Sequence, residues 1–299
     1  MTLADSVALS PDPEAVELVG QKPARLLKQA WRLWRTRIGV VLAGGVLLIA
    51  LFGPYIAPHG PSDFVGQPYS SSTGTFGTDH LGQDVWSRFL YGGRSILWIA
   101  AAATFIGITT GALVGLVAAY SRNSLDDVLM RAMDVILAFP QIMLALVALV
   151  TLGAQAWLII LAVGLTTTPR VARVVRGAAQ PIVERDFVAA ADALGVARWR
   201  ILFSEVLPNI MSPLMVETSL RLTYAIALVA SLAFLGFTPD PTGADWGLMI
   251  FENRIALSVQ PWGVMLPIIA IGLLTLGTGL IGDGIARAAA GIDRRRGGE

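Results

Sequence analysis

Long apolar runs alternate with shorter polar segments along most of the chain. Each run is close to the length of about 20 residues that an α-helix needs to cross a hydrocarbon core of about 30 Å. Because the backbone finds no water to bond in lipid, a helix is the expected form of each run. The pattern predicts an all-α membrane protein, a polytopic bundle of six transmembrane helices over residues 38–57, 95–120, 128–151, 156–170, 211–237 and 262–286.

A polar leader, residues 1–37, precedes the first run. Residues 1–24 lack helical periodicity and are expected to be disordered. The following segment, up to Arg37, is a basic helical pattern that contains Trp31 and Trp34. Basic residues and tryptophans before a span are typical of an anchor on the cytoplasmic leaflet. The leader places the first apolar run too far from the start for a cleaved signal peptide, so we expect a retained span.

The first span belongs to a unit, residues 38–94, that ends in an amphipathic segment. Residues 84–94 place Val85, Trp86, Phe89 and Leu90 on one helical face, so we expect this segment to lie along the external membrane interface. The remaining spans form a core, residues 95–288, and a basic tail, 289–299, follows it.

A polar loop, residues 178–209, separates the fourth and fifth spans and contains two short helical patterns. The first pattern places on one face Phe187, Ala190, Ala191 and Leu194, and the second places on one face Trp199, Leu202, Phe203 and Val206. Gly195 interrupts the patterns, and Pro208 closes the second because proline lacks an amide donor. The alanine-rich surface would let another protein's backbone approach closely; alternatively, the loop is a connector packed on its own bundle.

Two further features concern packing inside the spans. Gly107, Gly111 and Gly115 form two overlapping GxxxG units, and small residues at this spacing let helices approach closely in lipid. Their partner is either another helix of this chain or a partner chain. Pro140 lies inside the third span, where it predicts a kink.

The distribution of charge predicts the orientation. Only 14% of the residues are charged against 55% hydrophobic. With the N-terminus in the cytoplasm, 17 of the 22 Lys and Arg residues fall on the cytoplasmic side of the six spans. The positive-inside rule therefore predicts that both termini and the loop 178–209 are cytoplasmic.

The residues offer no catalytic, cofactor or metal site. The only lysines, Lys22 and Lys28, do not follow a glycine-rich phosphate loop, so this chain by itself is not an ATPase of that type. His59 and His80 have no metal-ligand spacing and are expected to be solvated loop histidines. No cysteine, GxSxG or HExxH sequence is present, so an intramembrane enzyme has no visible catalytic group.

Ionisable residues inside spans suggest further roles. Glu217 and Arg221 are four residues apart and can pair on one helix face, either as a local ion pair or as a substrate contact. Asp283 lies between two glycines, where a helix-end or loop role is expected.

The loop resembles the coupling loop of binding-protein-dependent ABC importer permeases, whose motif is Glu-Ala-Ala, three residues, Gly, and then Leu-Pro. Ala190, Ala191, Gly195, Leu207 and Pro208 fit the motif, and Ala189 stands where the usual glutamate would be. Other segments resemble the C-type subunit of the dipeptide/oligopeptide/nickel group: FGTDHLGQDVWSRFLYGGR (76–94), TPRVARVVRG (168–177), SLAFLGFTPDPTGADWGLM (231–249) and GDGIARA (282–288).

The resemblance implies an importer of di- or oligopeptides in the plasma membrane of a prokaryote. It implies a homologous second permease subunit, two cytoplasmic ATPase subunits that bind ATP and Mg²⁺, and an external substrate-binding protein, with membrane lipid around the spans and no nucleic acid. The residues implied for ATPase coupling are Phe187, Ala189, Ala190, Ala191, Asp192, Leu194, Gly195 and Arg198. Alternatives are an importer of nickel, metal chelates or glutathione, and a self-contained secondary carrier. Substrate-binding residues are left unassigned.

Overall fold

The structure, a computed structural model, describes residues 23–121, 124–240 and 243–290. Five of its helices are long and apolar enough to cross a membrane. They are α3 (Trp34–Ile56), α4 (Val85–Tyr120), α7 (Ala156–Val183), α11 (Met211–Phe234) and α13 (Trp262–Ala289). The described residues contain no strand beyond isolated bridges. The prediction of an all-α, multi-pass membrane protein is therefore confirmed.

The third apolar run is a broken span. It consists of α5 (Ser124–Leu137) and α6 (Gln141–Leu152), which meet at an angle of 80°. Pro140 precedes α6, has no amide hydrogen and disfavours helical geometry at Phe139. The Gln141 side-chain amide donates a hydrogen bond of 2.8 Å to the Thr166 carbonyl on α7, which holds the break against the bundle. The predicted kink is confirmed, and α5 with α6 brings the possible number of spans to six.

Shorter helices connect or flank the spans. α2 (Pro23–Arg32) precedes α3, and α12 (Trp246–Asn253) with a 3₁₀ turn (Arg254–Ala256) lies between α11 and α13. The loop between α7 and α11 contains α8 (Asp186–Ala193), α9 (Arg198–Arg200), a π-helix (Ile201–Val206) and α10 (Leu207–Asn209).

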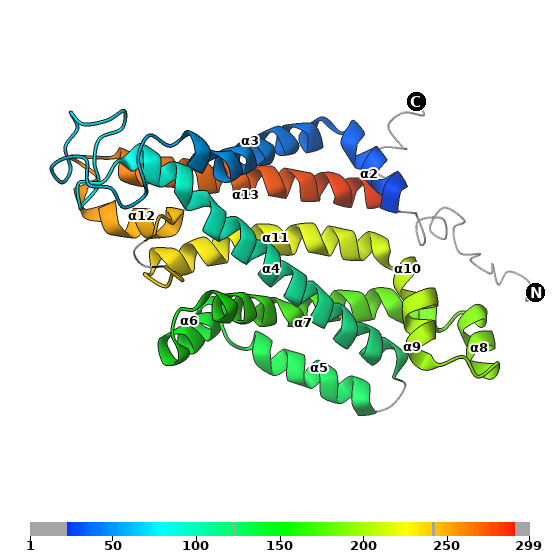
Figure 1. Ribbon diagram of the computed structural model, residues 1–299. Helices are drawn as coiled ribbons and strands as arrows, with labels where there is room; N and C mark the ends of the chain where they lie inside the picture. The colour runs from blue at the N-terminus through cyan, green and yellow to red at the C-terminus, as the bar shows by residue number, and fades with distance from the viewer. Residues whose placement is uncertain (1–22, 122–123, 241–242, 291–299) are drawn as a thin grey trace, which may run out of the picture.

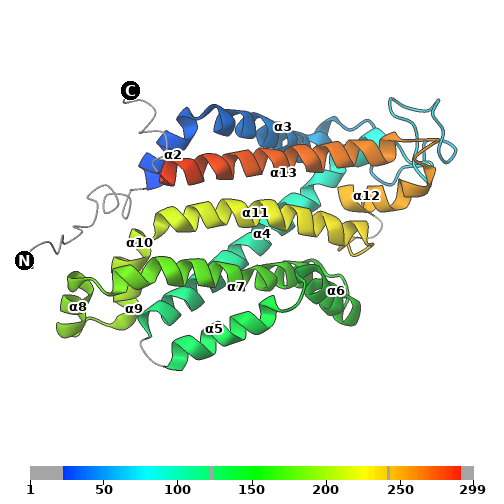
Figure 2. The same cartoon turned by 180° about the vertical axis from the view of Figure 1, so that it is seen from behind.

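Figures 1 and 2 show how these elements are arranged. Helices α3 and α13 lie side by side, and α4 crosses the bundle obliquely toward α9 and α7. Helices α8 and α2 lie at one end of the bundle, here called the α8 end, whereas α12 and the loop before α4 lie at the other, the α12 end. The central core contains buried apolar side chains of most of these helices, among them Ile96 and Ile99 of α4, Val163 of α7 and Val229 of α11.

The predicted glycine packing lies within this chain. A Cβ atom added to Gly111 would come within 2.5 Å of the Val171 Cβ on α7, and one added to Gly107 would lie 2.8 Å from the Gly164 carbonyl oxygen. A Cβ on Gly115 would lie 2.5 Å from the Ala172 carbonyl oxygen. These glycines let α4 and α7 pack backbone to backbone, so the alternative of a partner chain at this face is wrong.

Two predicted boundaries differ from the structure. The segment 84–94 is not a separate interfacial helix, because α4 runs without a break from Val85 to Tyr120 and Val85, Phe89 and Leu90 are buried. The boundary between 94 and 95 therefore falls inside one helix. Likewise, α7 continues to Val183 rather than ending near 170. The extensions carry charged residues such as Arg88 and Arg173, which explains why hydropathy marked only the other part of each helix. The predicted disorder of 1–24 lies almost wholly outside the described residues, as does most of the tail 289–299.

Candidate coupling surface and cap

Helix α8 ends in a glycine turn that reverses the chain. Gly195 has φ +70°, a left-handed conformation that favours glycine. Its amide donates to the Asp192 carbonyl at 3.0 Å, and the Val196 amide donates to the Ala191 carbonyl at 3.1 Å. This pair of bonds is a Schellman motif, which satisfies carbonyls at a helix end. Gly195 therefore has a conformational role in separating the two helical patterns of the loop, as the sequence predicted.

One face of α8 packs on the bundle. Val188 is 3% exposed and lies in a cluster with Ile182 and Val183 of α7 and Ile201 of the π-helix. Ala191 is partly buried against the same cluster. The loop is thus a connector packed on its own helices, which was one of the two interpretations of the sequence.

Among the described residues, none packs over the other face of α8. Leu194 is 82% exposed and Phe187 is 39% exposed, and Ala189, Ala190 and Asp192 are exposed beside them. We call these five residues the coupling surface. Helix α8, which carries most of it, lies at one end of the bundle, beyond the ends of α4 and α7 (Figure 1). An apolar, small-residue surface on a rigid helix is suited to contact with another protein.

The second helical pattern of the loop is wound differently from the prediction. Leu202 and Val206 are buried, but Trp199 and Phe203, expected on the same face, are 63% and 46% exposed. The reason is the π-helix, in which the Leu207 amide bonds to the Leu202 carbonyl, five residues earlier. Pro208 follows and cannot donate to the preceding turn, which favours this wider winding. The predicted spacing of 3.6 residues per turn does not apply here.

The coupling surface is joined to α4. The Tyr120 hydroxyl, at the last residue of α4, donates a hydrogen bond of 3.0 Å to the Asp192 carboxylate. A hollow of about 320 Å³ lies beside this bond and is lined by residues that include Val183, Val188 and Arg198. Arg198 therefore lies next to the coupling surface.

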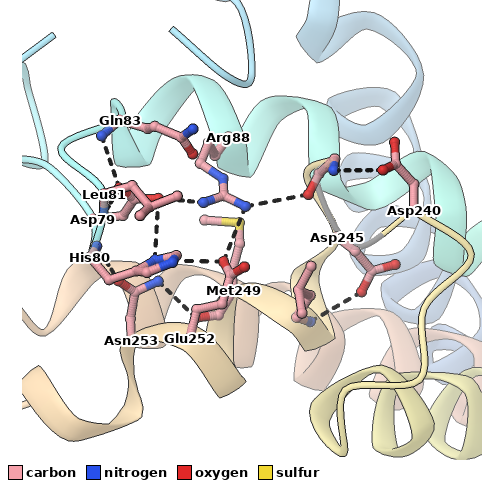
Figure 3. Close-up of polar contacts among 12 residues, drawn as sticks. Asp79, His80, Leu81, Gln83, Arg88, Asp240, Asp245, Met249, Glu252 and Asn253 are labelled. Atoms are coloured by element: carbon pink, nitrogen blue, oxygen red, sulfur yellow. Dashed lines mark hydrogen bonds and ion pairs between the residues drawn. The ribbon is translucent and has the colours of Figure 1, made fainter. Parts of the chain in front are cut away.

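At the α12 end, residues 57–84 and α12 form a second structured region, here called the cap. Figure 3 shows its central ion cluster around Arg88, the fourth residue of α4. Arg88 is only 2% exposed and pairs with Asp79, and its Nη2 lies 3.1 Å from Glu252 of α12. His80 Nδ1 lies 3.8 Å from a carboxylate oxygen of each acid. Burial is the largest influence on Glu252 and raises the pKa of its carboxyl.

The ligand atoms of Asp79, His80 and Glu252 lie close enough together to hold a cation, within 4.8 Å of one another. However, the Arg88 guanidinium already contacts both carboxylates, and its positive charge opposes a metal ion at the same point. The ion pairs of this cluster connect α12 to the loop that precedes α4. The expectation of solvated loop histidines fits His59, whose side chain is 45% exposed, better than it fits His80, whose side chain is 25% exposed.

Aromatic packing completes the cap. Trp246, the first residue of α12, is fully buried, and its Nε1 donates a hydrogen bond of 2.8 Å to the Phe89 carbonyl. A Cβ on Gly93 would lie 2.6 Å from the Trp246 ring, so the glycines of the YGGR sequence make room for this side chain. Asp245 caps α12 by accepting from the amides of Gly247 and Leu248, and burial raises the pKa of its carboxyl.

Two of the charged groups singled out within the spans are paired. The Glu217 and Arg221 side chains lie 2.8 Å apart and are both buried, so the predicted pair on one helix face is confirmed. Asp283 lies within α13 rather than at its end, and it contacts Arg35 and Arg287, each at 3.1 Å. This residue joins the start of α3 to α13.

Comparison with known proteins gives consistent results. A family described as the binding-protein-dependent transport system inner membrane component matches residues 107–291. The chain is 38% identical over 283 residues to a putative peptide transport system permease protein of Brucella suis, with 92% of this chain and 94% of that protein covered. It is 35% identical over 277 residues to a di/tripeptide transport system permease protein of Pseudomonas aeruginosa, covering 88% and 91%. A glutathione transport system permease protein of Pectobacterium atrosepticum is 32% identical over 274 residues, covering 88% and 91%.

Proposed function

This chain belongs to the family of binding-protein-dependent transport system inner membrane components, and from this membership we propose that it is the transmembrane permease subunit of an ATP-driven importer of di- or oligopeptides. Relatives named as peptide and di/tripeptide permeases align over about nine-tenths of the chain. The helical bundle supplies one half of a translocation path, and a homologous permease subunit supplies the other.

The coupling surface is the observation that carries this proposal. A permease without a phosphate-binding loop must receive the energy of ATP from partner subunits, which bind the nucleotide and Mg²⁺. The exposed apolar face around Phe187, Ala190 and Leu194 is suited to lie in a groove of such a subunit. If the groove moves when ATP binds, α8 moves with it, and the coupling free energy comes from the difference between the contacts in the two states.

The proposed orientation follows from charge. The α8 end carries the basic helix α2 and the arginines near the end of α7, so this end faces the cytoplasm. The cap then faces outward, where its tied loops form a firm surface for a substrate-binding protein. Ion pairs such as those of Arg88 with Asp79 and Glu252 hold the loops of the cap together, which favours a docking surface of constant shape.

Peptides are the proposed substrates because relatives named for peptide and di/tripeptide transport are 38% and 35% identical to this chain. Glutathione is a second candidate, supported by the Pectobacterium relative. Both substrates are small peptides with free carboxylates, so the same translocation path can carry either of them. The substrate-binding protein then determines which one is imported.

The test is purification of the tagged chain from its host in mild detergent, followed by reconstitution. We expect a second permease and ATPase subunits to accompany it, and uptake of a labelled dipeptide to require ATP and the binding protein. Competition with unlabelled dipeptide and with glutathione separates the two substrate candidates. A chain that purifies alone and transports in liposomes without ATP would be a secondary carrier, and the proposal would be wrong.

A further inference from the structure

An apolar groove lies on the side of the bundle between α3, α4, α11 and α13. Its volume is about 380 Å³, and its lining includes Val40, Gly44 and Leu47 of α3, Leu222 and Ile226 of α11, and Ile281 of α13. Thr278 is the one polar side chain of the lining, and its hydroxyl is already bonded to the Leu274 carbonyl at 2.9 Å. The groove therefore offers no free polar group to hold water.

The groove lies within membrane-spanning helices, which limits what can fill it. An apolar hollow at membrane depth is favourable for a hydrocarbon chain and unfavourable for water or a polar ligand. The volume suits a large part of one fatty acyl chain rather than a whole lipid.

Positive charge lies at the α8 end of the groove. Arg37 is one helical turn before Val40, so the two side chains lie on the same side of α3. Its Nε donates to the Trp31 carbonyl at 3.1 Å, and among the described residues no group bonds to its remaining nitrogens. The guanidinium is exposed, which leaves it able to contact an anion at the membrane surface.

The neighbouring helix α2 also has the features of a segment at the membrane surface. Leu26 and Ala30 are buried, and Ala30 packs against Ile285 and Ala288 of α13, which fixes α2 across the end of the bundle. Trp31 of α2 and Trp34, the first residue of α3, are 54% and 67% exposed. Exposed tryptophans beside basic residues are typical of the level of lipid headgroups.

We propose that this groove is a binding site for an anionic phospholipid, whose acyl chain lies along Val40, Gly44 and Leu47 and whose phosphate group contacts Arg37. The lipid would fill the wedge between α3, α13 and α11 on the side where α4 turns away from them (Figure 1). The site is separate from the coupling surface, and its occupancy does not depend on peptide transport.

Adjacent glycines supply a matched pair of variants. A Cβ atom on Gly44 or on Gly45 meets nothing within 4 Å, so both positions accept a large side chain. Gly44 lines the groove, whereas Gly45 is exposed and is not part of the lining. Gly44→Trp fills the groove, and Gly45→Trp adds the same side chain outside it.

The experiment adds phosphatidylglycerol or phosphatidylcholine with identical acyl chains to the delipidated complex and counts bound lipid by native mass spectrometry. Wild type and Gly45→Trp should retain phosphatidylglycerol about fivefold more tightly than phosphatidylcholine, the factor expected from one basic residue at an anionic surface. Gly44→Trp should lose the bound lipid. Arg37→Gln should keep the lipid but lose the preference between headgroups.

Two results would overturn the proposal. If Gly44→Trp and Gly45→Trp retained the same lipid, the groove would not be its site. If Gly44→Trp released the second permease subunit instead of lipid, the groove would be covered by that subunit.

Discussion

Tyr120 ends α4 and donates a 3.0 Å hydrogen bond to Asp192 on α8, so the coupling surface is tied to the longest helix of the bundle. At 1.5 Å per residue the 36 residues of α4 span about 54 Å. The other end of α4 is capped by Asp84, and Arg88 and Phe89 bind it to the cap. A displacement of α8 can therefore reach the opposite end through one continuous helix.

Tyr120→Phe tests this tie because it removes only the hydroxyl. The bond is exposed to water, so we expect a loss of unfolding free energy of no more than about 1 kcal/mol. We also expect fewer peptides imported per ATP hydrolysed. The control is Tyr224→Phe, since Tyr224 is 54% exposed on α11 and away from α8. An equal effect of both variants on the peptide-to-ATP ratio would show that the tie has no coupling role.

Leu194→Ala tests whether the coupling surface binds the ATPase subunits. The side chain is 82% exposed, so its loss should leave the thermal unfolding midpoint of the isolated permease pair nearly unchanged. Affinity for the ATPase subunits should fall, measured by titration of those subunits onto the permease pair. The matched control is Leu257→Ala at the α12 end, where Leu257 is 41% exposed. Unchanged affinity for Leu194→Ala would contradict the assignment.

Gly111→Leu tests the packing of α4 on α7. Even a Cβ would lie 2.5 Å from the Val171 Cβ, so the helices must separate. Overpacking of this kind costs about 1–3 kcal/mol, which should lower the thermal unfolding midpoint measured in detergent. Gly177→Leu is the control, because a Cβ at Gly177 on α7 meets nothing within 4 Å. Equal midpoints for the two variants would disprove close packing at Gly111.

The ionisation of Asp245 should make the cap less stable at neutral pH than at acidic pH. Burial raises the pKa of this carboxyl above its ordinary value of 3.8, so the folded cap binds the proton more tightly than the unfolded chain. This contribution to stability is full below the ordinary pKa and is lost as the pH rises through the raised one. Burial raises the pKa of Glu252 as well, so its contribution has the same sign.

Hydrogen exchange of α12 amides in wild type and Asp245→Asn, compared at equal pH, measures this effect. Asparagine keeps the capping oxygen but does not ionise. We expect the variant to gain protection relative to wild type as the pH rises from about 4 to 7, the range above the ordinary Asp value. Asp63→Asn, at an exposed residue of the cap loop, is the control. A difference between wild type and Asp245→Asn that does not change with pH would contradict the assigned pKa shift.

Hydropathy was sufficient for the number and order of the spans but not for their ends. The start of α4 carries buried polar residues such as Ser87 and Arg88, and the end of α7 carries exposed ones such as Arg173, so a window of apolar residues cannot detect these ends. The Gly195 turn was predictable because only local backbone conformation is involved. The placement of Phe203 on one face with Leu202 and Val206 was predicted wrongly because the π-helix changes the residue spacing.

The cap could not be derived from local pattern. The Trp246 bond to Phe89 joins residues 157 positions apart, and the His80 amide bond to Asn253 spans 173 positions. No periodicity within either segment predicts the other as its partner. Segments 76–94 and 231–249 both resemble one subgroup of permeases. The structure shows that these two segments pack on each other.

The most direct test of the central claim is the rate of ATP-driven peptide uptake by the reconstituted complex carrying Ala190→Asp. Ala190 is exposed on α8, so a carboxylate there leaves the bundle folded but places a charge on the coupling surface. We predict that uptake falls by more than about tenfold, the loss expected for a charge buried without a partner in an interface. Ala190→Ser, which adds a single oxygen, should import nearly as wild type does. Normal uptake by Ala190→Asp would contradict the claim that α8 couples this permease to its ATPases.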